Sequence, residues 1–229
     1  MPPAAARGAL KRPLTDVFGV EPPSDEWRAE AWRDYPAPII RAGDHGQREC
    51  VLAGFGMVPK AEIKRRNEET MQRTGAPPKV RDYDTMNARL ETIGKLQSFA
   101  KYWRECRLAL VGATAVYEPC WETGKAVRWR IGLPDGEPFA IAGLWRDWPD
   151  GSATFTMPTV AAETHALMRR MHAPGKEKRS VVILPRDEWD DWLNCRDPEL
   201  ARSFLRLYPA DAMVAEAAPA PPRKKAVEA

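Results

Sequence analysis

The stretch LALVGATAVYEPCWETGKAVRWRIGLPDGEPFAIAGLW, residues 108–145, decides how the rest of the chain is interpreted. It opens and closes with apolar runs, at 108–116 and 139–145. Apolar runs of this length, bounded by turn residues, are typical of buried strands. Between them, 127–131 alternates apolar and basic residues, which is typical of a half-buried strand. The turn Pro134-Asp135-Gly136 separates that strand from the last run, so we predict three consecutive strands.

The pair Tyr117-Glu118 ends the first apolar run. A carboxylate at the end of a buried strand is costly to desolvate, and such a group is usually paired or functional. The alternative is a strand-end glutamate that faces solvent, and the local pattern does not separate the two. Glu118 is therefore a candidate site residue.

The composition is typical of a globular protein, with 229 residues, 44% of them hydrophobic and 29% charged. No apolar run approaches a membrane span, and the N-terminus lacks the apolar core of a signal peptide. We therefore expect a cytoplasmic protein with no membrane partner. The net charge of +3 requires any nucleic-acid surface to be a local patch.

Signals for metal and cofactor chemistry are weak in this sequence. The 4 cysteines are widely spaced and include no Cys-x-x-Cys pair, so neither a zinc site nor a disulfide framework is predicted. There is also no Gly-rich phosphate loop, no Gly-x-Ser-x-Gly elbow and no His-Glu-x-x-His helix. We expect no metal and no cofactor.

The order of predicted elements favours one α+β domain at 14–208, with a mainly antiparallel, barrel-like sheet flanked by helices. Residues 1–13 are expected to form a flexible arm, and the Ala/Pro/Lys-rich residues 209–229 a disordered tail. Residues 61–73 predict a polar, solvent-facing helix with a basic cluster. Residues 161–171 predict another helix, which would place His165 at the surface.

The arginines and tryptophan at 128–130 allow two interpretations. Arginine with an interleaved aromatic ring suits single-stranded nucleic acid, because cations meet phosphates and rings stack on bases. The ordinary interpretation is a strand with Trp129 on its core face and arginines on its wet face, and the alternation favours it.

Several motifs, in chain order, resemble the SOS response-associated peptidase (SRAP) family, whose members process abasic sites in DNA. They are NARLET at 87–92, SF at 98–99, CRLALV at 106–111, VYE at 116–118, GEPFAIAGLW at 136–145, His172, and VVILP at 181–185 before Trp189. The resemblance extends from about Leu14 to Leu193. It implies a compact α+β fold with a positively charged groove for single-stranded DNA.

The resemblance also implies roles for individual residues. The family's catalytic asparagine, glutamate and histidine fall on Asn87, Glu118 and His172. Its DNA-contacting residues fall on Arg89, Thr159 and Arg179. The turn that joins the family's histidine to its arginine is expanded here to HAPGKEKR, residues 172–179, so Arg179 matches only loosely.

The amino terminus departs from the family pattern. Family members carry a cysteine after the initiator methionine, and its amine and thiol together close a thiazolidine ring on the abasic aldehyde. This chain begins Met1-Pro2-Pro3, and its first cysteine is Cys50. One interpretation, which we favour, is an upstream in-frame start that supplies the cysteine. In the other, Pro2 is the nucleophile, and its secondary amine forms a transient iminium that leads to strand cleavage.

The predicted function is an abasic-site processing protein of the DNA damage response, which links covalently to the ring-opened abasic aldehyde and processes its own N-terminus. The alternatives are a non-covalent single-stranded DNA binder, an imine-type lyase that cleaves at abasic sites, and a peptidase. The expected partner is single-stranded DNA with abasic sites. We expect a cytoplasmic monomer that associates with the nucleoid during repair.

Overall fold

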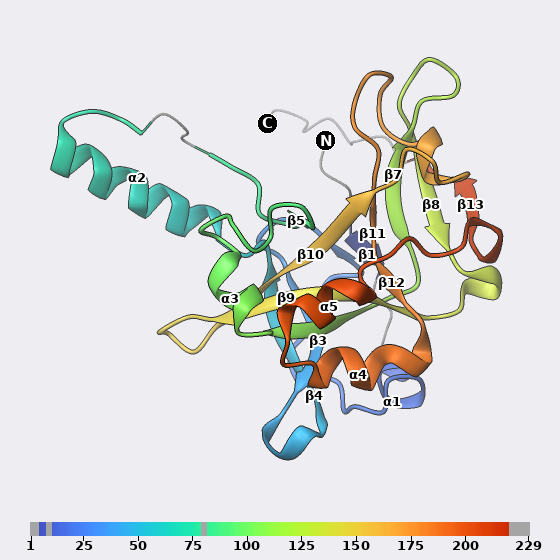
Figure 1. Cartoon of the computed structure of the whole chain (residues 1–229), viewed down its shortest axis with the longest axis horizontal. Helices are drawn as coiled ribbons and strands as arrows, with labels where there is room; N and C mark the ends of the chain where they lie inside the picture. Colours follow the sequence, from blue (N-terminus) through green and yellow to red (C-terminus); the bar gives the residue numbers. More distant parts are fainter. Residues whose placement is uncertain (1–4, 8–10, 79–81, 220–229) are drawn as a thin grey trace, which may run out of the picture.

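The computed structural model describes residues 5–7, 11–78 and 82–219. An eight-stranded mixed sheet forms the centre of the fold, with few helices around it (Figure 1). Its strands are β3 (Pro36–Ala42), β4 (Arg48–Phe55), β5 (Asn87–Arg89), β6 (Leu108–Ala113), β9 (Phe139–Asp147), β10 (Ala153–Ala161), β11 (Arg179–Val181) and β12 (Ile183–Leu184). This arrangement confirms the predicted α+β class.

The strand order is β11-β10-β4-β3-β6-β9-β12, with β5 also paired to β10. Every pairing is antiparallel except those that β10 makes with β4 and β5. Because β10 pairs with β9 as well as β4, the strands β10, β4, β3, β6 and β9 close into a ring. Only residues 153–156 of β10 make this closure, and β5, β11 and β12 lie outside it. The sheet is therefore mainly antiparallel but not a strict barrel.

The predicted strand at 108–116 is split between two sheets. A bend at Thr114 separates β6 from β7 (Val116–Cys120), which pairs with β8 (Val127–Gly132) in a three-stranded sheet. The third member is β13 (Val214–Ala217), so part of the predicted disordered tail is an ordered strand on β8. The residues of β13 are mostly exposed, so backbone pairing with β8 rather than burial holds this strand. The composition of the segment did not indicate this pairing.

Two apolar cores lie on the two faces of the large sheet, and alternate residues of β6 enter each. Leu108 and Leu110 belong to one core, and Ala109 and Val111 to the other. All six residues of β6 are buried. A strand covered on both faces reads as a continuous apolar run, which explains the pattern at 108–113.

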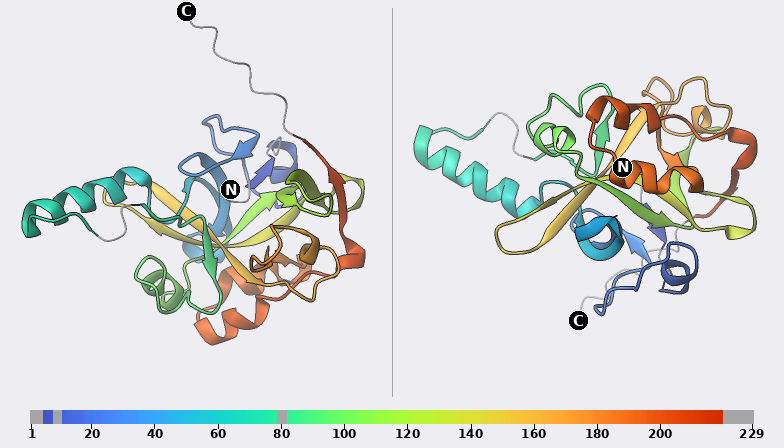
Figure 2. Two further views of the ribbon diagram at one scale, coloured as in Figure 1. Left: turned by 90° about the horizontal axis from the view of Figure 1, so that it is seen from above. Right: turned by 60° about the horizontal axis from the view of Figure 1, so that its bottom comes forward.

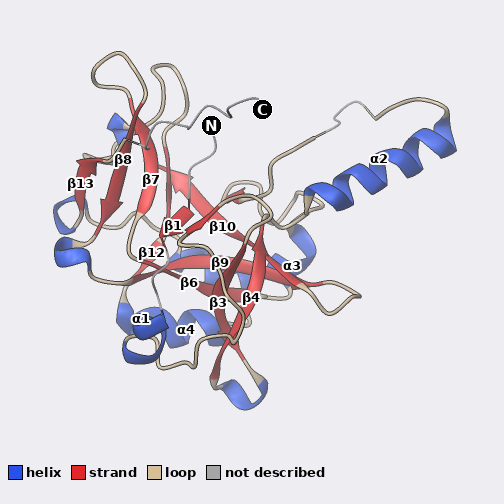
Figure 3. Ribbon diagram, turned by 180° about the vertical axis from the view of Figure 1, so that it is seen from behind, coloured by secondary structure: helices blue, strands red, loops and turns tan. Residues whose placement is uncertain are grey.

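The helices surround this frame: α1 (Lys11–Asp16), α2 (Lys60–Thr74), α3 (Ala100–Arg104), α4 (Trp189–Asn194) and α5 (Pro198–Phe204). Figure 3 shows α1 and α4 together on one side of the sheet, where Trp189 and Trp192 of α4 enter one of the apolar cores. Helix α2 extends away from the sheets (Figure 2), and Ile63 is its buried residue. This agrees with the polar helix predicted at 61–73. A minor two-stranded sheet joins β1 (Ala5–Arg7) to β2 (Glu30–Ala31).

The helix predicted at 161–171 is wrong. Strand β10 runs through Ala161 because it pairs with β11, and only a 3-10 turn follows, at Met168–Arg170. His165, expected at the surface, is 7% exposed. Its Nε2 lies 2.8 Å from the Tyr208 carbonyl, and its Nδ1 accepts from the Met168 amide at 3.0 Å. The contact with Tyr208 is the long-range one, and it holds His165 inside the fold. Within the described ranges, no helix is long and apolar enough to cross a membrane.

Candidate functional site

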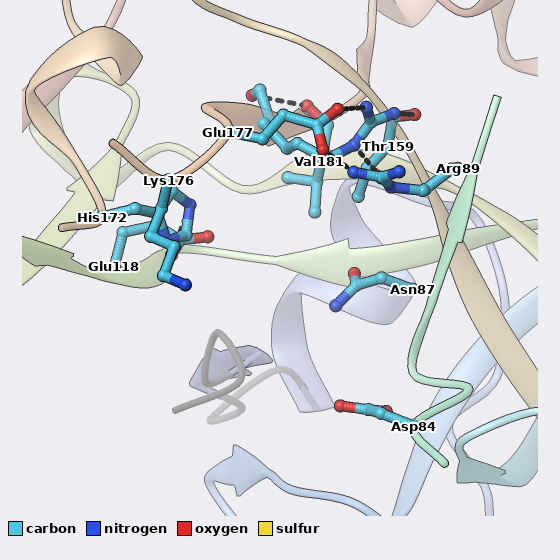
Figure 4. A pocket seen from close by; sticks show the side chains of 11 residues that line it. Asp84, Asn87, Arg89, Glu118, Thr159, His172, Lys176, Glu177 and Val181 are labelled. Atoms are coloured by element: carbon cyan, nitrogen blue, oxygen red, sulfur yellow. Dashed lines mark hydrogen bonds and ion pairs between the residues drawn. The ribbon is translucent and has the colours of Figure 1, made fainter. Parts of the chain in front are cut away.

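A pocket of about 450 Å³ lies where β5, β7, β10, β11 and the loop 172–178 meet (Figure 4). With the exception of Pro2, which lies outside the described residues, every residue predicted for the site lines it: Asn87, Arg89, Glu118, Thr159, His172 and Arg179. The structure therefore confirms that Asn87, Glu118 and His172 converge, although they are distant in sequence.

Strand β5 positions Asn87 and Arg89 through its alternation. Ala88 is fully buried in the core, so its two neighbours point to the opposite side, toward the pocket. The parallel pairing with β10 sets Arg89 opposite Thr159. Asn87 Oδ1 is buried and finds no hydrogen-bond partner within the described part of the chain. A buried acceptor without a donor is costly, and here it is available to a bound amine or hydroxyl.

Glu118 is buried because of its place in β7. Val116 and Cys120, its neighbours on the same face of the strand, both belong to a core cluster. Glu118 is only 4% exposed, and its Oε2 has no hydrogen-bond partner among the described residues. Burial disfavours the charged form and raises the pKa of this carboxyl to about 8. At neutral pH the group is therefore mostly protonated and can donate a proton.

His172 is brought to Glu118 by backbone contacts with β7. A β-bridge joins Met171 to Cys120, and the His172 amide donates to the Pro119 carbonyl at 2.7 Å. His172 Nε2 then lies 3.5 Å from Glu118 Oε2. Burial, followed by the nearby charge of Lys178, lowers the pKa of the imidazole. The pair is therefore a protonated carboxyl beside a neutral imidazole, which is a proton donor beside a proton acceptor.

The loop that carries His172 is held in an unfavourable backbone conformation. His172 has φ +61°, in the left-handed region that costs a non-glycine residue about 1–2 kcal/mol. Lys178 stabilises this loop, since its Nζ donates to the carbonyls of Met171 at 2.6 Å, His172 at 2.8 Å and Ala173 at 3.1 Å. The position of His172 thus depends on a lysine outside its own turn.

Arg179 forms the other side of the pocket with Thr159. Its Nε donates to Thr159 Oγ1 at 3.0 Å, and its Nη2 donates to the Thr159 carbonyl at 2.6 Å. It is also ion-paired with Glu91, at 2.9 Å, and with Glu177, at 2.6 Å. Glu177 contacts Arg89 as well (Figure 4). Arg179 therefore lies at the pocket although the turn before it, residues 172–179, is expanded.

Sequence reasoning missed several residues of the pocket wall, notably Asp84, Lys176 and Glu177. The signal available for the last two was the alternation Lys-Glu-Lys-Arg at 176–179, within the expanded turn.

The arginines at 128–130 follow the ordinary interpretation. Arg128 stacks on Tyr117 at 3.6 Å and pairs with Glu30 at 2.9 Å. Trp129 packs against the core. These side chains are engaged within the fold.

Comparison with known proteins extends the resemblance to most of the chain. The family model described as SOS response associated peptidase (SRAP) matches residues 11–220. The chain is 32% identical over 150 residues to a Bacillus subtilis (strain 168) protein named abasic site processing protein YoqW, and 31% identical over 150 residues to YobE of the same organism. Each match covers 61% of this chain, and 63% and 65% of the respective relatives. The chain thus matches somewhat less than two thirds of these relatives' length.

Solved structures agree with this result. A crystal structure of a Bordetella bronchiseptica protein is 34% identical, with a TM-score of 0.80 over 94% of this chain and 99% of that one. A Bacteroides thetaiotaomicron protein, 21% identical over 82% of this chain and 78% of its own, has a TM-score of 0.61 and supports the fold alone.

Proposed function

Because this chain belongs to the SOS response associated peptidase (SRAP) family, we propose that it processes abasic sites, binding single-stranded DNA and linking covalently to the ring-opened aldehyde. The observation that carries the proposal is the protonated Glu118 beside a neutral His172, with the unpaired Asn87 Oδ1 in the same pocket. Relatives named abasic site processing proteins support it.

The pocket offers a proton donor and an acceptor for condensation of an amine with an aldehyde. The amine nitrogen attacks the aldehyde carbon, and the C=O electron pair moves to oxygen. The His172 imidazole takes the proton that the nitrogen loses and passes it to that oxygen, which becomes the carbinolamine hydroxyl. Glu118 then donates its proton to the carbinolamine hydroxyl, which leaves as water while the C=N bond forms. General acid–base assistance of this kind contributes typically 10²–10⁴-fold. The Asn87 Oδ1 accepts a hydrogen bond from the incoming amine and orients it.

An N-terminal amine is the proposed nucleophile, and the position of β1 supports it. β1 lies beside β7, the strand that carries Glu118. An extended chain spans about 3.3–3.6 Å per residue, so the amine of Pro2, three residues before Ala5, is at most about 11 Å from it. A cysteine supplied upstream would instead place the amine further along the chain from Ala5. The cysteine closes a stable ring, and Pro2 stops at an iminium.

For DNA binding we propose that Arg89 and Arg179 contact phosphates and that Thr159 contacts the DNA backbone. Arg89→Ala should weaken binding to all single-stranded sequences alike. It should also reduce the slope of log affinity against log salt by about 0.7, the value for one phosphate contact on single strands. Fluorescence anisotropy across a salt series measures both quantities. Unchanged affinity at low salt would remove Arg89 from the interface.

Abasic single-stranded DNA, denaturing gels and borohydride test the covalent step and separate the alternatives. A heat-stable band without borohydride indicates ring closure by a thiol. A band that requires borohydride, and disappears when the terminal amine is acetylated, indicates an iminium, and strand cleavage then identifies a lyase. Binding without any band indicates a non-covalent binder and overturns the proposal. Cleavage of an unrelated protein would instead support a peptidase.

We also propose that the chain processes its own N-terminus, because a reactive amine must be exposed before it can attack. Intact-mass analysis of the purified protein should show that the residues before the reactive amine are removed. Glu118→Gln should leave those residues in place. Complete removal in that variant would assign the processing to another enzyme.

A further inference from the structure

Glu177 lies against the cations that the proposed function assigns to DNA. Its carboxylate forms ion pairs with Arg89 and with Arg179, the latter at 2.6 Å (Figure 4). These arginines come from β5 and β11, strands that both pair with β10. One carboxylate therefore occupies the space between two guanidinium groups at the wall of the pocket.

This arrangement matches the needs of a phosphodiester. Guanidinium groups bind carboxylates and phosphates with the same paired N–H donors, so one anion can replace the other at the same arginines. Glu177 can leave, since its side chain is 39% exposed and sits in a loop, whereas Arg179 is only 13% exposed and is fixed by Thr159. Arg179 is thus held in place by Thr159, whereas the anion beside it is movable.

The loop is anchored next to Glu177 without depending on it. Lys178 holds the carbonyls of residues 171–173, which keeps His172 in place whatever Glu177 contacts. Lys176, on the other side, lines the pocket. Release of Glu177 would therefore remove the ion pair of Arg89 and leave Arg179 paired with Glu91, with Lys176 beside them at the pocket wall.

We propose that Glu177 closes a phosphate-binding site in the free protein and is displaced by a DNA backbone phosphate, so that it sets the affinity for single-stranded DNA. This inference rests on the proposed function. Each binding event breaks two ion pairs, which weakens reversible binding to intact DNA. Retention at an abasic site then comes from the covalent bond, and undamaged strands are released quickly.

The test compares wild type with Glu177→Gln, which keeps the shape and removes the charge, and with Glu177→Ala as a second variant. Undamaged single-stranded DNA is titrated across a salt series. We expect both variants to bind about three- to tenfold more tightly at low salt, as loss of two partly exposed ion pairs implies. The slope of log affinity against log salt should also steepen, by up to about 0.7 for each phosphate bound at this site, because counterions rather than Glu177 then leave the arginines on binding.

Two controls isolate the effect. Glu188→Gln removes a glutamate that pairs with Arg206, at the side of α4 and α5, and reports the general effect of one lost negative charge. Arg89→Ala combined with Glu177→Gln reports coupling, since the gain from Glu177→Gln should shrink when one of its two partners is absent.

The possible outcomes separate a failure of this inference from a failure of the proposed function. If Glu177→Gln and Glu177→Ala bind no more tightly than Glu188→Gln while Arg89→Ala still weakens binding, Glu177 is not a competitor, and the DNA site stands. If wild type and every variant fail to bind single-stranded DNA, the proposed function and the inference fail together. Tighter binding by both variants, with a steeper slope and coupling to Arg89, supports the inference.

Discussion

Glu62 on α2 and Glu118 on β7 are both largely covered glutamates, yet their protonation states are opposite. The carboxylate of Glu62 forms ion pairs with Arg65, at 2.7 Å, and with Arg66, at 2.6 Å. The hydrogen bond from Arg65 contributes most, and together the two arginines lower the pKa of the carboxyl to about 2. Glu118 lies at 3.5 Å from a histidine whose own pKa is lowered, and burial raises the pKa of Glu118 to about 8.

Limited side-chain exposure alone does not decide the charge of a carboxylate, because desolvation raises its pKa whereas cationic partners lower it. The helix surrounds Glu62 with cations at i+3 and i+4, so the ionised form is stabilised locally. The strand presents Glu118 to apolar neighbours and a neutral imidazole, so the protonated form is favoured. The first arrangement stabilises a surface helix, and the second prepares a proton donor at a cost in stability.

The largest expected effect is on the reaction. In protein prepared with the reactive amine already exposed, Glu118→Gln should slow formation of the borohydride-trapped adduct with abasic DNA by about 10²–10³-fold, because the amide cannot donate the proton that expels water. Time courses on denaturing gels measure the rate. Glu62→Gln is the matched control and should react like wild type. An equal rate in Glu118→Gln would exclude Glu118 as the acid.

The second effect concerns stability against pH. The folded pKa of Glu118 is raised, so its favourable contribution is complete below the unfolded value, near 4.5, and is lost as pH rises toward 8. Glu118→Gln removes this loss. The free energy of unfolding of Glu118→Gln minus that of wild type should therefore be higher at pH 7 than at pH 4, by roughly 2 kcal/mol or more. Urea unfolding at both pH values tests this, and a difference independent of pH would mean that Glu118 is ionised in the folded protein.

A smaller effect is expected from Lys178, which acts through His172. Lys178→Met should slow adduct formation by about tenfold, since misplacement of a catalytic group by a fraction of an ångström is costly. Loss of the nearby charge should raise the pKa of His172, so the acidic limb of the pH–rate profile should move to higher pH. A slower reaction with an unmoved limb would indicate a structural role alone.

The smallest effect is expected on α2. Glu62→Gln should lower the free energy of unfolding by about 0.2–1 kcal/mol at pH 7, as is usual for exposed helix pairs. The folded pKa of Glu62 is lowered, so this contribution is present above about pH 4.5 and fades as pH falls toward 2. Urea unfolding at pH 7 and pH 3 checks the sign. A larger difference at pH 3 than at pH 7 would contradict the ion-pair explanation.

Parts of the site could be predicted because they depend on local pattern and on motifs. Asn87 and Arg89 lie in a motif of the family that the chain resembles, and Glu118 ends an apolar run. Glu177 could not be singled out, because its partners Arg89 and Arg179 are on different strands that only pairing with β10 brings together.

The buried strands and the ion pairs of α2 follow from the sequence alone, since both arise from the spacing of residues along one element. Two other features depend on long-range pairing, which outweighs local propensity. β10 continues to Ala161 because it pairs with β11, and Val214–Ala217 forms a strand because it pairs with β8. The tertiary structure also decided the protonation of Glu118. Desolvation and Coulomb interactions depend on which atoms surround a group in space, and those atoms come from distant parts of the chain.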